Sequence, residues 1–92
     1  MPALRLYVDD DTPNSRRAVA ELRALRSHLQ PDAEVEVIDI RADPEVAERE
    51  RLLAVPVLVR LGPGPVRRII GDLSDRAAVL SFLHLTHQNE AW

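Results

Sequence analysis

Four short stretches of the chain have the apolar pattern of β-strands. Leu4–Val8 is apolar apart from one arginine, and Glu34–Ile40 alternates between acidic and aliphatic residues, so each predicts a strand. Val55–Leu61 is the most apolar stretch, and Pro56 inside it indicates a strand start, an edge or a bulge. Val66–Ile70 is the fourth stretch. In the second stretch, alternation places three residues on one face: Val35, Val37 and Asp39.

The first predicted helix has the clearest helical signals. It begins at Pro13, directly after Thr12, which is a favourable N-cap residue, and it ends at Pro31. Apolar residues recur at helical spacing along it and predict one buried stripe. The stripe consists of Ala18, Leu22, Leu25 and Leu29.

Two shorter helices are predicted later in the chain. Asp43 and Pro44 repeat the pattern of a cap followed by proline, and the charged segment Glu45–Leu53 follows. We expect Val46 and Leu53 to face inward. The last helix is predicted to run from about residue 75 to residue 87. The residues expected on its inward side are Leu73, Ala77, Leu80, Leu83 and His84.

Two adjacent arginines lie in the last predicted strand. Because side chains alternate across a strand, Arg67 and Arg68 point to opposite faces. An edge strand whose arginines reach water along their apolar stems explains this pattern. The alternative is that the pair binds an acidic partner surface or a phosphate, which guanidinium groups suit. Gly71 ends the strand, and Asp72 or Ser74 is predicted to cap the last helix.

The predicted order of elements is β-α-β-α-β-β-α. Strands separated by helices favour right-handed crossovers and parallel pairing, whereas the last two strands, joined by a short Gly/Pro turn, favour an antiparallel hairpin. A small sheet with helices on both faces is the thioredoxin-like arrangement of the α/β class. We therefore expect residues 1–92 to form a single thioredoxin-like domain.

Composition narrows the possible functions. The 92 residues include no cysteine, which excludes thiol redox chemistry, and the net charge of −3 argues against a general nucleic-acid-binding protein. All 12 basic residues are arginine, so chemistry that depends on lysine is also excluded. Because no apolar run approaches the ~20 residues of a membrane span and no signal-peptide pattern is present, we expect a cytoplasmic protein without membrane contact.

The start of the first helix is where a thioredoxin-like domain carries its dithiol. In this chain the position reads Thr12–Ser15, without cysteine, so oxidoreductase activity is excluded. Val55–Val57 stands where that fold usually has a cis-proline. We therefore predict a cis peptide bond before Pro56.

Two other kinds of chemistry fit parts of the sequence poorly. Asp9–Asp11 follow the first strand, as aspartates do in some phosphatases and in receiver domains, but both classes rely on a lysine; stabilisation of a helix N-terminus explains the acids better. His84, His87 and Glu90 lie about one helical turn apart, as metal ligands can, yet nothing else completes a ligand shell. We find no catalytic constellation and expect no cofactor and no metal.

Five collinear segments between residues 4 and 85 resemble the KaiB family of bacterial circadian-clock adaptors. They are Leu6–Val8, Thr12–Ser15, Val37–Glu48, Leu52–Leu58 and Pro65–Arg76, of which the last is the most specific. The resemblance implies a non-enzymatic protein that binds the ATPase ring of KaiC and recruits or displaces other signalling partners. KaiB-like domains also occur fused to sensor histidine kinases and as paralogues outside clocks.

The resemblance also implies a set of partner-binding residues. Arg17, Arg51, Arg67 and Arg68 coincide with basic positions of the family, where they would meet an acidic surface of a KaiC-like ATPase; solvated surface arginines are the alternative. A second interpretation is a thioredoxin-like sensory module that engages a histidine kinase, a response regulator or a KaiA-like partner. The acidic run Asp9–Asp11 departs from the alanine, glycine and asparagine usual in clock members, which indicates a divergent paralogue.

The family is known for two folds, a tetrameric ground state and a monomeric thioredoxin-like form. In clock members the last helix has glycine and aspartate where this chain has Phe82 and His84, and both family residues are weaker helix formers. We therefore expect the thioredoxin-like monomer here, with the tetrameric ground-state fold as the alternative. We assign Pro56, Gly71, Phe82 and His84 as determinants of the fold state.

Overall fold

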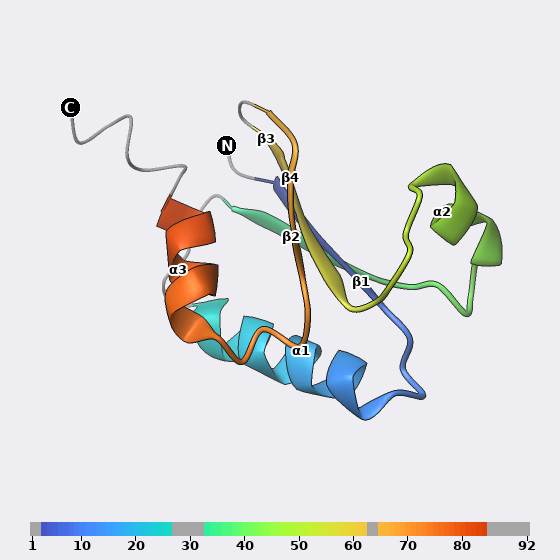
Figure 1. Cartoon of the computed structure of the whole chain (residues 1–92), viewed down its shortest axis with the longest axis horizontal. Helices are drawn as coiled ribbons and strands as arrows, with labels where there is room; N and C mark the ends of the chain where they lie inside the picture. The colour runs from blue at the N-terminus through green and yellow to red at the C-terminus, as the bar shows by residue number, and fades with distance from the viewer. Residues whose placement is uncertain (1–2, 27–32, 63–64, 85–92) are drawn as a thin grey trace.

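Four strands pair into one sheet in the computed structural model, which describes residues 3–26, 33–62 and 65–84 (Figure 1). β1 (Ala3–Val8) pairs in parallel with β2 (Glu34–Asp39) and antiparallel with β3 (Val57–Gly62). β4 (Arg67–Ile70) pairs antiparallel with β3, so the strand order is β2-β1-β3-β4. The predicted order of helices and strands is confirmed.

The prediction of parallel pairing is correct for β1 and β2 and wrong for β3. The helix between β2 and β3, α2 (Pro44–Arg49), has only 6 residues. Such a helix is about 9 Å long, whereas a six-residue strand spans about 20 Å. This helix by itself is too short to carry the chain back along the sheet, and β3 starts at the end where β2 finishes and runs antiparallel to β1.

Two helices cover one face of the sheet (Figure 1). α1 (Pro13–Leu25) and α3 (Arg76–His84) contribute to the larger core, and an ion pair between Arg76 Nε and Glu21 Oε2, at 3.4 Å, joins them. The buried residues of this core are Leu4, Leu6, Val8, Ala18, Leu22, Leu25, Leu58, Leu73, Val79 and Phe82. The predicted stripe of α1 is thus confirmed as far as Leu25; its fourth member, Leu29, lies outside the described residues.

The N-terminus of α1 follows the prediction. Thr12 is the N-cap, its hydroxyl accepts the N–H of Ser15 at 3.2 Å, and Pro13 is the first helical residue. A cap of this kind satisfies one of the N–H groups that the first turn leaves without an acceptor.

The N-terminus of α3 differs from the prediction. The cap is Asp75, whose Oδ1 accepts the N–H of Ala78 at 3.1 Å, rather than Asp72 or Ser74. Leu73, with φ of 66°, lies in a left-handed turn before the helix. Its position therefore does not determine which residues of α3 face inward. As a result Ala77 is exposed, and Val79 is buried in its place. The predicted continuation to residue 87 and the side chains of Leu83 and His84 lie outside what the structure describes.

The smaller core lies on the opposite face of the sheet, under α2. Its buried members are Tyr7, Val46, Val57 and Val59. The inward position of Val46 is as predicted, but Leu53 is 99% exposed and Leu52 packs against this core instead. The reason is that α2 ends four residues earlier than predicted: Arg51, with φ of 53°, turns the chain out of the helix.

The β3–β4 hairpin joins two of the predicted fold-state residues. β3 begins directly after Pro56, and the Val55–Pro56 bond is cis, as predicted. The N–H of Gly71 donates to the carbonyl oxygen of Pro56 at 3.0 Å and so extends the ladder by one bond. Gly71 has φ of 128°, a conformation that residues with a Cβ rarely adopt.

Alternation in β2 is as predicted, because Val35, Val37 and Asp39 pair with Leu4, Leu6 and Val8 on the face that α1 covers. Val37 is 48% exposed because β2 is an outer strand. None of the helices in the described part of the chain is long and apolar enough to cross a bilayer.

Candidate functional site

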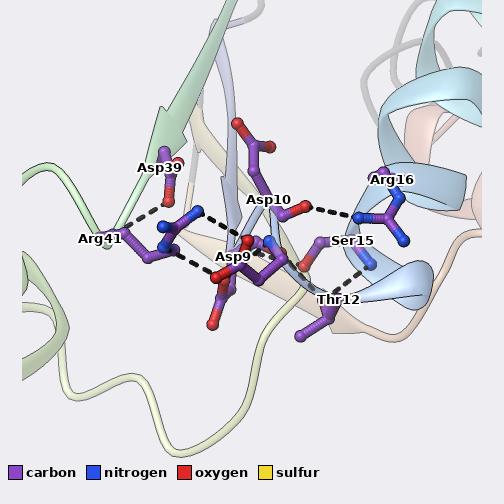
Figure 2. A network of polar contacts seen from close by, with 8 residues as sticks. Asp9, Asp10, Thr12, Ser15, Arg16, Asp39 and Arg41 are labelled. Atoms are coloured by element: carbon purple, nitrogen blue, oxygen red, sulfur yellow. Dashed lines mark hydrogen bonds and ion pairs between the residues drawn. The ribbon is translucent and has the colours of Figure 1, made fainter.

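Hydrogen bonds within the β1–α1 loop order its backbone (Figure 2). The N–H of Asp9 donates to the Ser15 hydroxyl at 2.9 Å, and both the N–H and the hydroxyl of Thr12 donate to the carbonyl oxygen of Asp9 at 2.9 Å. The N–H of Asp11 donates to the Asp9 carboxylate at 3.0 Å. The Ser15 side chain is buried. Its hydroxyl therefore ties the end of β1 to the first turn of α1.

Two arginines contact the acidic run in this loop (Figure 2). Arg41, which follows β2, places Nη1 3.1 Å from Asp11 Oδ1 and Nε 3.9 Å from Asp9 Oδ1. Arg16 Nη1 donates to the carbonyl oxygen of Asp10 at 2.9 Å. In residues 3–26, 33–62 and 65–84, no three or more histidine, aspartate or glutamate side chains are grouped to hold a metal ion. The side chain of His84 and residues 87 and 90, which completed the predicted metal-ligand group, lie outside what the structure describes.

Replacing Ser15 by alanine should lower the free energy of unfolding by about 1–2 kcal/mol, because the Asp9 N–H loses its acceptor inside the protein. Urea unfolding followed by circular dichroism measures the change. Asn14→Ala, at the exposed neighbouring position, is the matched control and should stay within about 0.5 kcal/mol of the wild type. Equal stabilities of the two variants would contradict the role given to the hydroxyl.

Arg17, one of the predicted partner-binding residues, is engaged within the chain. Its Nη1 lies 3.1 Å from Asp72 Oδ2, which links α1 to the turn after β4. The Asp72 carboxylate also accepts the N–H of Ser74 at 3.0 Å. Hydrogen bonds from Ser74 lower the pKa of Asp72, and Arg17 contributes a smaller lowering. The carboxylate is therefore well suited to remain the partner of Arg17.

β4 is, like β2, an outer strand of the sheet, and both of its arginines are exposed. Arg67 stands opposite Arg60 and Arg68 opposite Val59, so the two side chains point to opposite faces as predicted. The interpretation of this segment as an edge strand is confirmed. Arg68 Nη2 donates to the carbonyl oxygen of Glu50 at 2.7 Å, a contact that the sequence does not reveal.

The four predicted arginines lie on β4 or are connected to it, although Arg67 and Arg68 face opposite sides of the sheet. Arg67 and Arg68 belong to β4, Arg17 is paired with the turn that follows β4, and Arg51 directly follows the residue that accepts the hydrogen bond from Arg68. Toward the described residues, the side chains of Arg51 and Arg67 make neither an ion pair nor a hydrogen bond. We call this region the β4 edge.

A second polar network, on the face under α2, was not predicted. The Tyr7 hydroxyl donates to Glu50 Oε1 at 3.2 Å and accepts from Arg5 Nη1 at 3.2 Å. Arg5 Nε donates to Glu36 Oε1 at 3.0 Å, and the hydrogen bonds to Tyr7 and Glu36 raise the pKa of Arg5. A buried tyrosine usually finds a hydrogen-bond partner. That rule predicts a hydrogen-bond partner for Tyr7, but the carboxylate that accepts its hydroxyl lies 43 residues away in sequence.

A match to a family model shows which protein family this chain belongs to. The model described as the KaiB domain matches residues 5–85. The chain belongs to the KaiB family. This KaiB-family protein is 49% identical to the circadian clock oscillator protein KaiB of a Prochlorococcus marinus strain, over 89% of this chain and 71% of that protein. It is 46% identical to the circadian clock oscillator protein KaiB of Parasynechococcus marenigrum, over 96% of this chain and 86% of that protein.

Solved structures agree with the thioredoxin-like fold. The N-terminal domain of Synechococcus elongatus SasA superposes with a TM-score of 0.71 and 29% identity, over 95% of this chain and 85% of that one. Oxidized mitochondrial thioredoxin 3 of Saccharomyces cerevisiae superposes with a TM-score of 0.72 and 17% identity, over 89% of this chain and 76% of that one, which bears on the fold alone. This KaiB-family protein thus combines a thioredoxin-like fold with a sequence that has no cysteine.

Proposed function

We propose that this KaiB-family protein is a non-enzymatic, cytoplasmic adaptor that docks on the ATPase ring of a KaiC-like protein, in a circadian clock or a signalling pathway derived from one. The observation that supports the proposal is that the four arginines lie on β4 or are connected to it, in a fold whose family relatives are circadian clock oscillator proteins. The chain is proposed to act as a single domain of residues 1–92 and as a monomer.

The chemistry of the β1–α1 loop supports docking rather than catalysis. The hydroxyls of Thr12 and Ser15 stand at the two ends of the segment where a thioredoxin carries its thiols, and both are used in ordering the loop. The carboxylates of Asp9 and Asp11 are paired with Arg41. These groups stabilise the loop. A catalytic nucleophile, by contrast, would need a neighbouring base that activates it.

The β4 edge suits an acidic partner. Guanidinium groups bind carboxylates in a bidentate way and speed association with a surface of opposite charge. Arg51 and Arg67 are exposed and available for such contacts, whereas Arg17 would have to exchange Asp72 for a carboxylate of the partner. The exposed apolar side chains of Val66, at 58%, and Ile70, at 66%, flank the arginines and add surface that a partner can bury.

A second candidate is a sensory module that engages a histidine kinase, a response regulator or a KaiA-like partner. The observation in its favour is the likeness to the N-terminal domain of SasA, in which a thioredoxin-like unit is one part of a longer protein. The two candidates differ in their partner and share the same scaffold.

A binding experiment separates the two. The purified chain is passed over an immobilised KaiC-like ATPase in the presence of ADP or of ATP, and over an immobilised histidine kinase from the same organism. Size-exclusion chromatography with light scattering gives the mass of the free chain. Retention on the ATPase and a monomeric mass are expected. Retention on the kinase alone would favour the second candidate, and a tetrameric free chain would contradict the proposed monomer.

A further inference from the structure

The two neighbouring arginines of β4 have different surroundings. Arg67 faces the side of α3, and it lines a hollow of about 440 Å³ to which Arg68 and the α3 residues Ala78, Ser81 and Phe82 also contribute. Arg68 faces the other side, where its guanidinium donates to the carbonyl oxygen of Glu50 at 2.7 Å. One arginine is therefore available to a partner, and the other is committed to the last turn of α2.

Glu50 is held from two strands at once. Its carbonyl oxygen accepts from Arg68 of β4, and its carboxylate accepts from the Tyr7 hydroxyl of β1 at 3.2 Å, with Arg5 Nη1 3.9 Å away. Tyr7 is only 2% exposed, so its position is set by the core. These contacts fix the carboxyl end of α2 over the sheet.

The chain directly after Glu50 leaves α2 through a left-handed turn and exposes a leucine. The N–H of Arg51 donates to the Glu48 carbonyl at 3.2 Å and the N–H of Leu52 to the Ala47 carbonyl at 2.9 Å, which is the Schellman arrangement. Its left-handed position is usually glycine, yet here it is Arg51, with φ of 53°. Residues held in such conformations cluster at binding sites. Leu53, two residues on, is 99% exposed.

We propose that Arg51 and Leu53 form a docking knob and that Arg68 is a positioning residue that holds the knob through Glu50, while Arg67 makes the direct contact. This rests on the proposed function. The chemistry of the knob fits a site on the ATPase with an apolar socket for Leu53 and a carboxylate at its rim for Arg51. Arg68, although exposed, acts through the backbone of α2.

The matched variants Arg67→Gln and Arg68→Gln test this division of roles between the two arginines, because each removes one positive charge from the same strand. In the free chain, Arg68→Gln should speed amide hydrogen exchange of residues 51 and 52 by about tenfold, the factor expected for loss of one charge-assisted hydrogen bond. Arg67→Gln should leave that exchange unchanged. Equal exchange in both variants would overturn the positioning role, whether or not the chain binds an ATPase.

Binding kinetics on the immobilised KaiC-like ATPase test the knob. Arg68→Gln should raise the dissociation rate by about tenfold, and this effect should disappear in a Leu53→Ala background, because both changes disable the same contact. Arg67→Gln should instead slow association a few-fold at low salt and add to Leu53→Ala. Additive effects of Arg68→Gln and Leu53→Ala would overturn the knob. A wild-type chain that does not bind would overturn the proposed function, and the exchange measurement would still decide the positioning role.

Discussion

Phe82→Ala should lower the free energy of unfolding by about 3–5 kcal/mol, the largest effect we expect from a single substitution in this protein. Phe82 is only 7% exposed and packs in the larger core with Leu73 and Val79. It is also the only phenylalanine in the chain, so no other ring can fill the space that it leaves. For a domain of this size a loss of that order lowers Tm by more than about 10 °C.

Urea unfolding and calorimetry measure the effect. Ser81→Ala, at the exposed neighbouring position of α3, is the control and should change stability by less than about 0.5 kcal/mol. Phe82→Gly should cost about 1 kcal/mol more than Phe82→Ala, because glycine is a weaker helix former. A loss below about 1 kcal/mol for Phe82→Ala would show that Phe82 does not hold α3 on the sheet.

The same variants test the proposed role of Phe82 in the choice of fold. Phe82→Gly combined with His84→Asp introduces the glycine and aspartate that the resemblance to clock members implies at these positions, so we expect it to shift the population toward the tetrameric ground state if the two folds differ by only a few kcal/mol. Light scattering reports the mass, and NMR reports whether residues 53–61, of which 57–61 lie in β3 here, become helical. A variant that unfolds without forming a tetramer would argue against this role.

Reversing both arginines of β4, with Arg67→Glu and Arg68→Glu, should slow association with a KaiC-like ATPase by one to two orders of magnitude at low salt, about the size of electrostatic steering. The rates of the variant and the wild type should converge as salt is raised, because salt screens exposed charges. Stopped-flow or surface-based kinetics over a range of ionic strength measures both effects.

The control variant has the same net charge as the β4 variant, but its substitutions lie in another part of the chain. Arg23→Glu with Arg26→Glu alters two exposed arginines of α1 and, like the β4 variant, takes the net charge from −3 to −7, since each change subtracts two charges. If electrostatic steering comes from the β4 edge, this control should associate at a rate close to that of the wild type. Equal slowing in both double variants would mean that net charge alone controls association.

Signals between residues close in sequence determined the elements of this protein. The cap and proline at Thr12 and Pro13 start α1, and β3 starts after Pro56, because these residues act on the backbone beside them. The KaiB motifs are also local and collinear, so membership of the family could be predicted from them, and the family model confirms it.

Only the tertiary structure decided the direction of β3, the exposure of Leu53 and the partners of the arginines. Arg17 pairs with a carboxylate 55 residues away, and Tyr7 bonds to Glu50 across 43 residues, so no periodicity could reveal either contact. The end of α2 depends on the left-handed conformation of Arg51, a residue that does not favour it by itself. The order of the elements is local information, whereas the surface that a partner meets is created by packing.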